Sequence, residues 1–255
     1  MEEEVKVILG LDVSTKTVGV TLALLDKEGE LKILQVTHLR PKIPTAIKGT
    51  EALFKKSKII SDELSKYKAY NVTDVIIEEP LVGSNNSETV ATLLRYNGMI
   101  SQLIHYIFGV IPVFISSYDA RKFAFPQIMA IRKFNKKGEV YDISKIRKCI
   151  EESKLVPFGE YPYDCAKKLI LWNFVSEKYP EIEWQYKKNG DLKDENFDAS
   201  DSLVCVLGYV NKCKYENDTP VVKNVTEKAI GDGGETEFTY TVEFCGETYE
   251  KRILI

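Results

Sequence analysis

The order of β-rich and helical patterns predicts an α/β fold built on a mixed sheet. Three short β-rich runs open the 255-residue chain and are joined by turn residues, which is typical of an antiparallel meander. After residue 44, helical periodicity alternates with short apolar strands, as it does where helices connect parallel strands. We therefore expect a mixed five-stranded sheet flanked by helices, followed by a small C-terminal β appendage.

The opening meander is predicted from residues 5–36. Residues 5–12 (VKVILGLD) and 17–25 (TVGVTLALL) are rich in aliphatic and β-branched residues, as central strands are. The sequence Asp-Lys-Glu-Gly at 26–29 supplies a turn, and residues 31–36 then return beside the second strand. These three strands form the antiparallel half of the predicted sheet.

Helices and further strands follow in alternation. The spacing of apolar residues predicts amphipathic helices over 44–70 and 87–108. Between them, residues 72–77 form a short buried strand that stops at Pro80, because proline has no N–H to donate to a sheet. Residues 111–115 provide the fifth strand. The same criteria predict helices over 118–123, 163–179 and 197–210.

Two regions are additional to this pattern. Residues 127–148 hold seven basic residues against two acidic ones, a local charge of +5 that suits either an arm contacting a DNA backbone or a disordered insertion. The C-terminal part alternates like strands over 221–225, 237–244 and 249–255. The expected organisation is a main domain over 1–215, with an inserted basic segment at 127–160, and a β appendage over 216–255.

Composition excludes several classes of protein. With 35 Lys and Arg against 38 Asp and Glu, the net charge is −3, so nucleic-acid binding must be argued from local features. The five cysteines contain no CxxC pair, which argues against a disulfide framework and a zinc ribbon. No apolar stretch reaches the roughly 18 to 20 residues of a membrane span, and the acidic start is unlike a signal peptide. We expect a cytoplasmic protein without membrane contact.

Four carboxylates are candidates for a metal site. Asp12 and Glu78 end two predicted strands, and ligands of α/β sheets bind beyond the carboxyl ends of strands. Asp198 and Asp201 are three residues apart on a predicted helix, and so share one face. Converging carboxylates favour a hard cation such as Mg²⁺ or Mn²⁺, and two such ions suit phosphodiester cleavage.

Each carboxylate also has a plainer explanation. An aspartate that ends a strand is more often a turn former, and Glu78 can be an exposed strand end. Asp198 and Asp201 can be a helix cap and a first-turn residue. The order along the chain favours the metal site: one acid on the first strand, one on the fourth, and a pair on a late helix.

The chain resembles the RuvC-type Holliday junction resolvases of the ribonuclease H-like superfamily. The resemblance lies in ILGLDVSTKTVGV at 8–20, VIIEEP with SNNS at 75–87, GVIPVF at 109–114 and NFDASDSLVCV at 196–206. It covers roughly residues 5–125 and 163–212 and implies a ribonuclease H-like fold. By position, Asp12, Glu78, Asp198 and Asp201 correspond to that family's metal-binding and catalytic residues, and Gly19 to a glycine of its first hairpin.

The resemblance also implies an activity: a Mg²⁺- or Mn²⁺-dependent crossover junction endodeoxyribonuclease. Such an enzyme acts as a homodimer on branched DNA, cuts by in-line attack of water and leaves 5′-phosphate and 3′-hydroxyl ends. Three departures place this chain among divergent relatives, phage-encoded ones included: the two additional regions, Val-Ser after Asp12 where Pro-Gly is usual, and a net charge that is not basic.

Candidate DNA contacts are cations and amides near these motifs, and for each the alternative is an ordinary solvated side chain. The candidates are Lys16, Asn85, Asn86, Arg95, Arg121, Lys122, Arg132, Lys133, Lys136 and Lys137. Tyr96 and Phe123 are possible wedges at a branch point, although core packing is the more common role of such residues.

Two other functions compete with the nuclease. The strand-Asp-Gly pattern at 8–20 also resembles the phosphate hairpin of actin-like kinases and ATPases, but the chain lacks a second such hairpin. A catalytically inactive DNA-binding scaffold of the same fold is the second rival. The four carboxylates argue against it, because an acidic cluster that binds no cation only destabilises a fold.

Overall fold

The computed structural model describes residues 5–80, 86–231 and 234–255, which fold into two compact units. The first unit comprises Met1–Ala120 and Leu171–Tyr209, and the second comprises Arg121–Ile170 and Val210–Ile255. The inserted basic segment and the C-terminal appendage, which we expected as separate additions, therefore belong to the same unit.

The first unit contains the predicted mixed five-stranded sheet. Its strands are β1 (Lys6–Val13), β2 (Val18–Leu25), β3 (Leu31–Leu39), β4 (Asp74–Glu78) and β5 (Val113–Ile115), in the order β3-β2-β1-β4-β5. The meander β1-β2-β3 is antiparallel, while β4 runs parallel to both β1 and β5. This topology confirms the α/β prediction and is that of the ribonuclease H-like fold.

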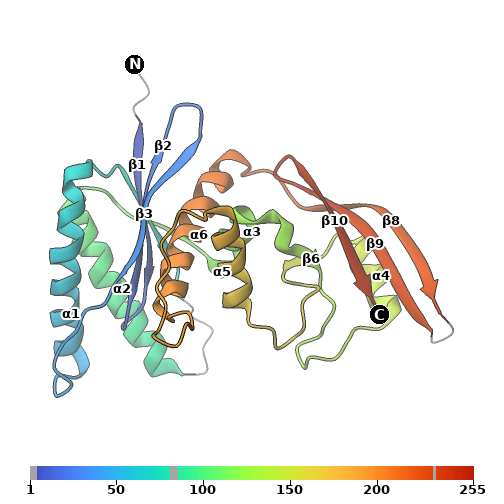
Figure 1. The fold of residues 1–255 in the computed structure, drawn as a ribbon, viewed down its shortest axis with the longest axis horizontal. Coiled ribbons are helices and arrows are strands. Elements are labelled where there is room, and N and C mark those ends of the chain that lie inside the picture. The colour runs from blue at the N-terminus through green and yellow to red at the C-terminus, as the bar shows by residue number, and fades with distance from the viewer. Residues whose placement is uncertain (1–4, 81–85, 232–233) are drawn as a thin grey trace. The chain divides into compact units, whose positions relative to one another are not determined.

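Helices cover both faces of this sheet (Figure 1). These are α1 (Gly49–Leu64) and α2 (Ser87–Phe108) on one face and α6 (Glu195–Lys214) on the other (Figure 1). Two further helices, α3 (Ser117–Ala124) and α5 (Lys167–Lys178), begin or end in this unit. The predicted helix over 44–70 is shorter than expected, because after α1 the chain tightens into the 3₁₀ helix η1 (Ser65–Tyr70) and stops at Asn71 with a φ of 55°. Apart from such boundaries, the predicted helices of this unit are confirmed.

The alternation of β1 assigns its residues to the two faces. Leu9, Leu11 and Val13 join a buried core with side chains of α1 and α2. The intervening residues Ile8, Gly10 and Asp12 point to the opposite face, since successive side chains of a strand alternate. That face is covered by α6 (Figure 1), so Asp12 lies on the same side of the sheet as the helix that carries Asp198 and Asp201.

The second unit combines two small sheets with one helix. Its elements are η2 (Pro126–Ile128), β6 (Met129–Ile131), α4 (Ile143–Glu151), β7 (Leu155–Pro157), β8 (Val221–Ile230), β9 (Glu235–Phe244) and β10 (Glu247–Leu254). Strands β6 and β7 pair with each other, and β9 lies between β8 and β10. The three C-terminal strands confirm the predicted appendage, although β8 extends well beyond the predicted 221–225.

A shared core explains why the inserted segment is ordered. Every second residue of β9, including Phe238, Tyr240 and Val242, is buried. These side chains pack in one cluster with Ile131 and Ile146 of the inserted segment. The interpretation of this segment as a disordered insertion is therefore wrong.

In the part of the chain that the structure describes, no helix is long and apolar enough to cross a membrane.

Candidate metal centre

Strand register places Asp12 beside Glu78. In the parallel pair β1·β4, Leu9 faces Val75 and Leu11 faces Ile77, so the next residues in register are Asp12 and Glu78. Neighbouring strands lie about 4.8 Å apart, and aligned residues of a parallel pair point to the same face. The strand-end rule therefore brings these two carboxylates together.

Helix α6 approaches the sheet closely because two glycines face it. A Cβ at Gly10 would lie 2.3 Å from Val206 Cγ2, and one at Gly19 would lie 1.9 Å from the carbonyl oxygen of Asp198. A buried hydrogen bond of 2.8 Å joins the hydroxyls of Thr21 and Ser202 at the same interface. Any side chain at either glycine would push the helix outward, so these positions set how near the acidic turn of α6 comes to β1.

Three of the four predicted carboxylates meet. Ligand oxygens of Asp12, Glu78 and Asp201 all lie within 4.8 Å of one another. Asp201 is 6% exposed, while the other two are half-buried. Such an arrangement of oxygen donors fits a hard divalent cation, because Mg²⁺ and Mn²⁺ prefer carboxylates and a cation offsets their mutual repulsion. The donor set therefore fits the metal that the sequence predicts.

Asp198 has a different environment from the other three. It is half-buried one helical turn before Asp201, and among the described residues it is outside the group of three. Its charge is one of those that raise the pKa of His38 on β3, against the larger effect of burial. A role for Asp198 as a fourth ligand stays a prediction.

His38, which the sequence analysis did not single out, lies in the same row of the sheet as Asp12. Asp12 faces Gly19 across β1·β2, and Gly19 faces His38 across β2·β3, so all three occupy one row of the sheet. Burial lowers the pKa of the His38 imidazole, and the nearby carboxylates of Glu195 and Asp198 act in the opposite direction. Pairing the predicted strands in register would have found it, because Gly19 puts no side chain between the aspartate and the histidine.

The turn after Asp12 is held in one conformation. The Ser14 hydroxyl accepts hydrogen bonds from the backbone N–H groups of Lys16 (3.3 Å) and Thr17 (3.1 Å). From α1, the Lys56 ammonium donates to the carbonyl of Thr15 at 2.6 Å. This short turn leaves Lys16 exposed, four residues after Asp12.

The other candidate DNA contacts of the first unit differ in their structural roles. Asn86 caps α2, since its side chain accepts from the Thr89 N–H at 3.1 Å. Arg95 is exposed on α2, whereas Asn85 lies outside the described residues. Tyr96 is completely buried in the core of the sheet, so core packing explains it and a wedge role does not.

The remaining candidates belong to the second unit. They are Arg121, Lys122, Arg132, Lys133, Lys136 and Lys137. The Lys122 ammonium lies 4.7 Å from the ring centroid of Phe123 and 5.0 Å from that of Phe244, so this cation is in contact with aromatic faces. Phe123 itself is 3% exposed and belongs to the core of this unit.

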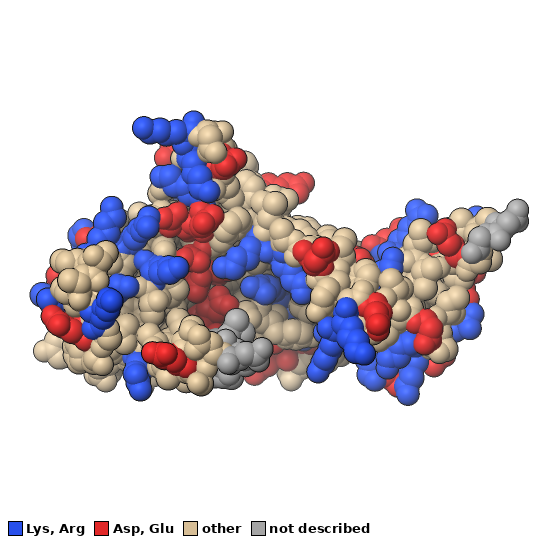
Figure 2. All heavy atoms as spheres, turned by 90° about the horizontal axis from the view of Figure 1, so that it is seen from below, with Lys and Arg blue, Asp and Glu red and all other residues tan. Residues whose placement is uncertain are grey.

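Charges of both signs share the surface. Figure 2 shows Lys and Arg side chains interspersed with Asp and Glu over the face that it draws, as the net charge of −3 suggests. Any attraction for a polyanion must therefore come from particular cations rather than from the charge of the whole molecule.

Solved structures with a similar fold are found, although sequence comparison finds no relative. No family model and no curated protein matches the sequence. Among solved structures, T. thermophilus RuvC in complex with a Holliday junction substrate is 10% identical with a TM-score of 0.47, and the match covers 82% of this chain and 95% of that one. The yeast mitochondrial Holliday junction resolvase Ydc2 is 15% identical with a TM-score of 0.43, covering 80% and 77%.

A third similar structure is the fowlpox virus resolvase with Holliday junction DNA, at 11% identity and a TM-score of 0.39, covering 81% of this chain and 98% of that one. Because all three TM-scores are below 0.5, the fold assignment rests on strand order and register. Together, the strand order and the three carboxylates define an α/β protein of ribonuclease H-like topology with a candidate site for a divalent cation.

Proposed function

We propose that this protein is a Mg²⁺- or Mn²⁺-dependent endodeoxyribonuclease that resolves four-way junctions or other branched DNA. The observation that carries the proposal is the meeting of Asp12, Glu78 and Asp201 at the carboxyl ends of β1 and β4. The preference for branched DNA comes from the resemblance of the four sequence stretches to junction resolvases.

The residues of the chain have distinct roles in this proposal. Asp12, Glu78 and Asp201 hold the cation, and Asp198 is the candidate for a further ligand of a second ion. When bound, the cation activates a water and stabilises the leaving oxygen of the phosphodiester. Lys16, exposed on the turn that follows β1, is placed to contact a phosphate of the bound strand.

The enzyme is further proposed to act as a homodimer. A four-way junction has two-fold symmetry, and two copies related by the same symmetry can nick opposed strands. Light scattering of the purified protein, alone and with a junction, measures this directly. A single copy bound to each junction would contradict the dimer without affecting the nuclease chemistry.

The decisive experiment incubates the protein with end-labelled four-way, three-way and linear DNA, with and without Mg²⁺. Cleavage of the branched substrates in Mg²⁺ is expected, with 5′-phosphate ends. Asp12→Asn and Glu78→Gln should reduce it to background while junction binding in EDTA survives, since affinity comes mainly from phosphate contacts. Glu79→Gln is the matched control, because Glu79 is the adjacent exposed carboxylate.

Metal binding has its own measurement. Titration of Mn²⁺ followed by electron paramagnetic resonance should show tight binding in the wild-type protein and in Glu79→Gln, and weakened binding in Glu78→Gln. Asp198→Asn tests the fourth ligand: loss of one of two bound ions supports it, and unchanged stoichiometry removes it. Equal Mn²⁺ binding by all variants would contradict the proposed centre.

The rival kinase or ATPase is tested on the same preparation. Turnover of ATP without cleavage of any DNA would replace the nuclease by the actin-like interpretation. Junction binding with neither cleavage nor Mn²⁺ binding would favour the inactive scaffold.

A further inference from the structure

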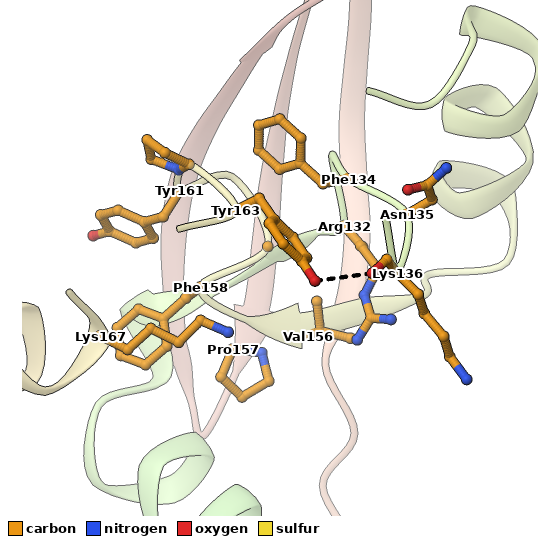
Figure 3. Close-up of a pocket in the computed structure, with 12 residues that line it drawn as sticks. Arg132, Phe134, Asn135, Lys136, Val156, Pro157, Phe158, Tyr161, Tyr163 and Lys167 are labelled. Atoms are coloured by element: carbon orange, nitrogen blue, oxygen red, sulfur yellow. Dashed lines mark hydrogen bonds between the residues drawn. The ribbon is translucent and has the colours of Figure 1, made fainter. Parts of the chain in front are cut away.

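A pocket of about 250 Å³ opens in the second unit beside β6 and β7 (Figure 3). Much of its wall is aromatic and comes from Phe134, Phe158, Tyr161 and Tyr163. The rings of Phe158 and Tyr161 meet edge to face with centroids 5.5 Å apart. Tyr163 is 55% exposed, so its ring offers a flat apolar surface to a ligand.

The cations of the pocket wall are Arg132, Lys136 and Lys167, all of them exposed. The described lining contains no carboxylate to neutralise them. Glu160, which is adjacent in sequence to two of the lining residues, pairs instead with the Lys251 ammonium at 3.0 Å. The pocket therefore joins aromatic faces to three cations, with no carboxylate among the described lining residues.

The wall is held in place by backbone contacts. The Tyr163 hydroxyl donates to the carbonyl of Lys136 at 2.9 Å (Figure 3). Its ring packs on the turn at Gly138, where φ is 83° and an added Cβ would lie 2.8 Å from the ring. Phe158 has a φ of 60°, a left-handed conformation that is costly for an aromatic residue. The hydrogen bond and the packing hold the Tyr163 ring in place before any ligand arrives, which lowers the ordering cost of binding.

We infer that this pocket binds one unpaired nucleotide of a DNA strand, with the base against the tyrosine rings and the flanking phosphates on Arg132, Lys136 and Lys167. Proteins that bind single strands combine the same two elements, aromatic platforms and a cationic track. The volume is below the roughly 300 Å³ at which pockets for drug-sized ligands begin, so it admits a single base and excludes a duplex. The choice of DNA as ligand rests on the proposed function.

The first test measures binding of a fluorescent oligo(dT) and of a matched blunt duplex in EDTA, so that no cleavage intervenes. Replacing Tyr161 by Leu, or Tyr163 by Leu, should weaken single-strand binding about tenfold, the loss expected when one stacked base loses its ring. Tyr161→Phe keeps the ring and should bind as the wild type does. Thermal melting of each variant establishes that it is folded.

The second test concerns charge. Lys136→Gln with Lys167→Gln should lower the slope of log K against log salt by about 1.4, from 0.7 for each phosphate contact of a single strand. The control Lys214→Gln with Lys228→Gln removes the same charge from exposed positions of the same unit outside the pocket lining. An equal fall of this slope in the control variant would refute nucleotide binding at the pocket. Unchanged single-strand binding by the folded Tyr161→Leu and Tyr163→Leu variants would refute it as well.

Photocrosslinking locates the contact. A strand carrying 5-iodouracil should crosslink to the peptide that contains Tyr161 and Tyr163, and crosslinking elsewhere alone would contradict the assignment. A failure of nucleotide binding at the pocket can be distinguished from a failure of the proposed nuclease activity. Junction cleavage with wild-type strand binding in the tyrosine variants rejects the pocket only, whereas pocket-dependent binding without any cleavage rejects only the nuclease.

Discussion

Replacing Gly19 by Ala tests the packing that assembles the candidate metal centre. The added Cβ would lie 1.9 Å from the carbonyl oxygen of Asp198 and 2.4 Å from its carbonyl carbon. Since Cβ contacts under 3.0 Å essentially never occur and both atoms belong to backbone, α6 must retreat by about 1.1 Å or more. Asp201 is on the next turn of the helix and moves away from Asp12 with it.

The expected size of the effect follows from this clash. Overpacking a tight interface costs about 1 to 3 kcal/mol. A loss of 1 kcal/mol lowers the melting temperature by about 2 to 4 °C in a domain of this size. Affinity for Mn²⁺ should fall roughly 10- to 100-fold, as it does when groups that support metal ligands are changed.

The assay is thermal melting of Gly19→Ala and of the control variant Gly98→Ala, each with and without Mn²⁺, together with a Mn²⁺ titration of both. Gly98→Ala is the control, because Gly98 is an exposed position of α2 where an added Cβ meets nothing within 4 Å. That variant should be stabilised by about 0.5 to 1 kcal/mol, since Ala is the better helix former. Wild-type melting and wild-type Mn²⁺ affinity in Gly19→Ala would refute the close approach of α6.

Three further predictions concern other parts of the chain. Tyr240→Phe removes the 3.0 Å acceptor of the buried Ile131 N–H and should cost about 1 to 3 kcal/mol in urea unfolding, whereas an unchanged midpoint would show that this amide has another partner. Thiol titration at pH 8 should modify the exposed Cys213 first and spare the buried Cys245. Burial and the nearby Asp218 raise the pKa of the Cys245 thiol to about 12, so equal rates of modification of the two thiols would contradict its burial. Asn86→Ala should lose about 1 kcal/mol of stability, whereas Asn86→Asp should not, because Asp caps a helix equally well. Since the Asp variant keeps its stability, weaker DNA binding by that variant would show a phosphate contact at this position.

Local patterns were sufficient to predict the sheet of the first unit. Strands β1 and β2 are eight residues each and almost entirely apolar, so their β character is plain in the sequence. Helix boundaries were less certain: the apolar spacing continues past Leu64, but the chain changes there from α to 3₁₀ geometry. The strand-end rule correctly brought Asp12 and Glu78 together, because parallel strands share one carboxyl edge.

The second unit was predicted less completely, since its order comes from contacts far apart in sequence. Strands β6 and β7 have three residues each, too few to show a period, and are joined through α4. Their burial depends on β9, about 100 residues further along the chain. The local sequence carries no information about that distant partner, so the inserted segment could be interpreted as disordered.

The sequence by itself determined which residues are acidic at the strand ends and which faces of the strands are apolar. From these follow the fold class and the pairing of two candidate ligands, Asp12 and Glu78. Only the tertiary structure decided that Asp201 joins Asp12 and Glu78, and that two regions assumed to be separate form one unit with an aromatic, cationic pocket. The reason is physical: periodicity fixes the direction in which a side chain points, whereas the distance between two elements depends on close packing, here on the missing side chains of Gly10 and Gly19.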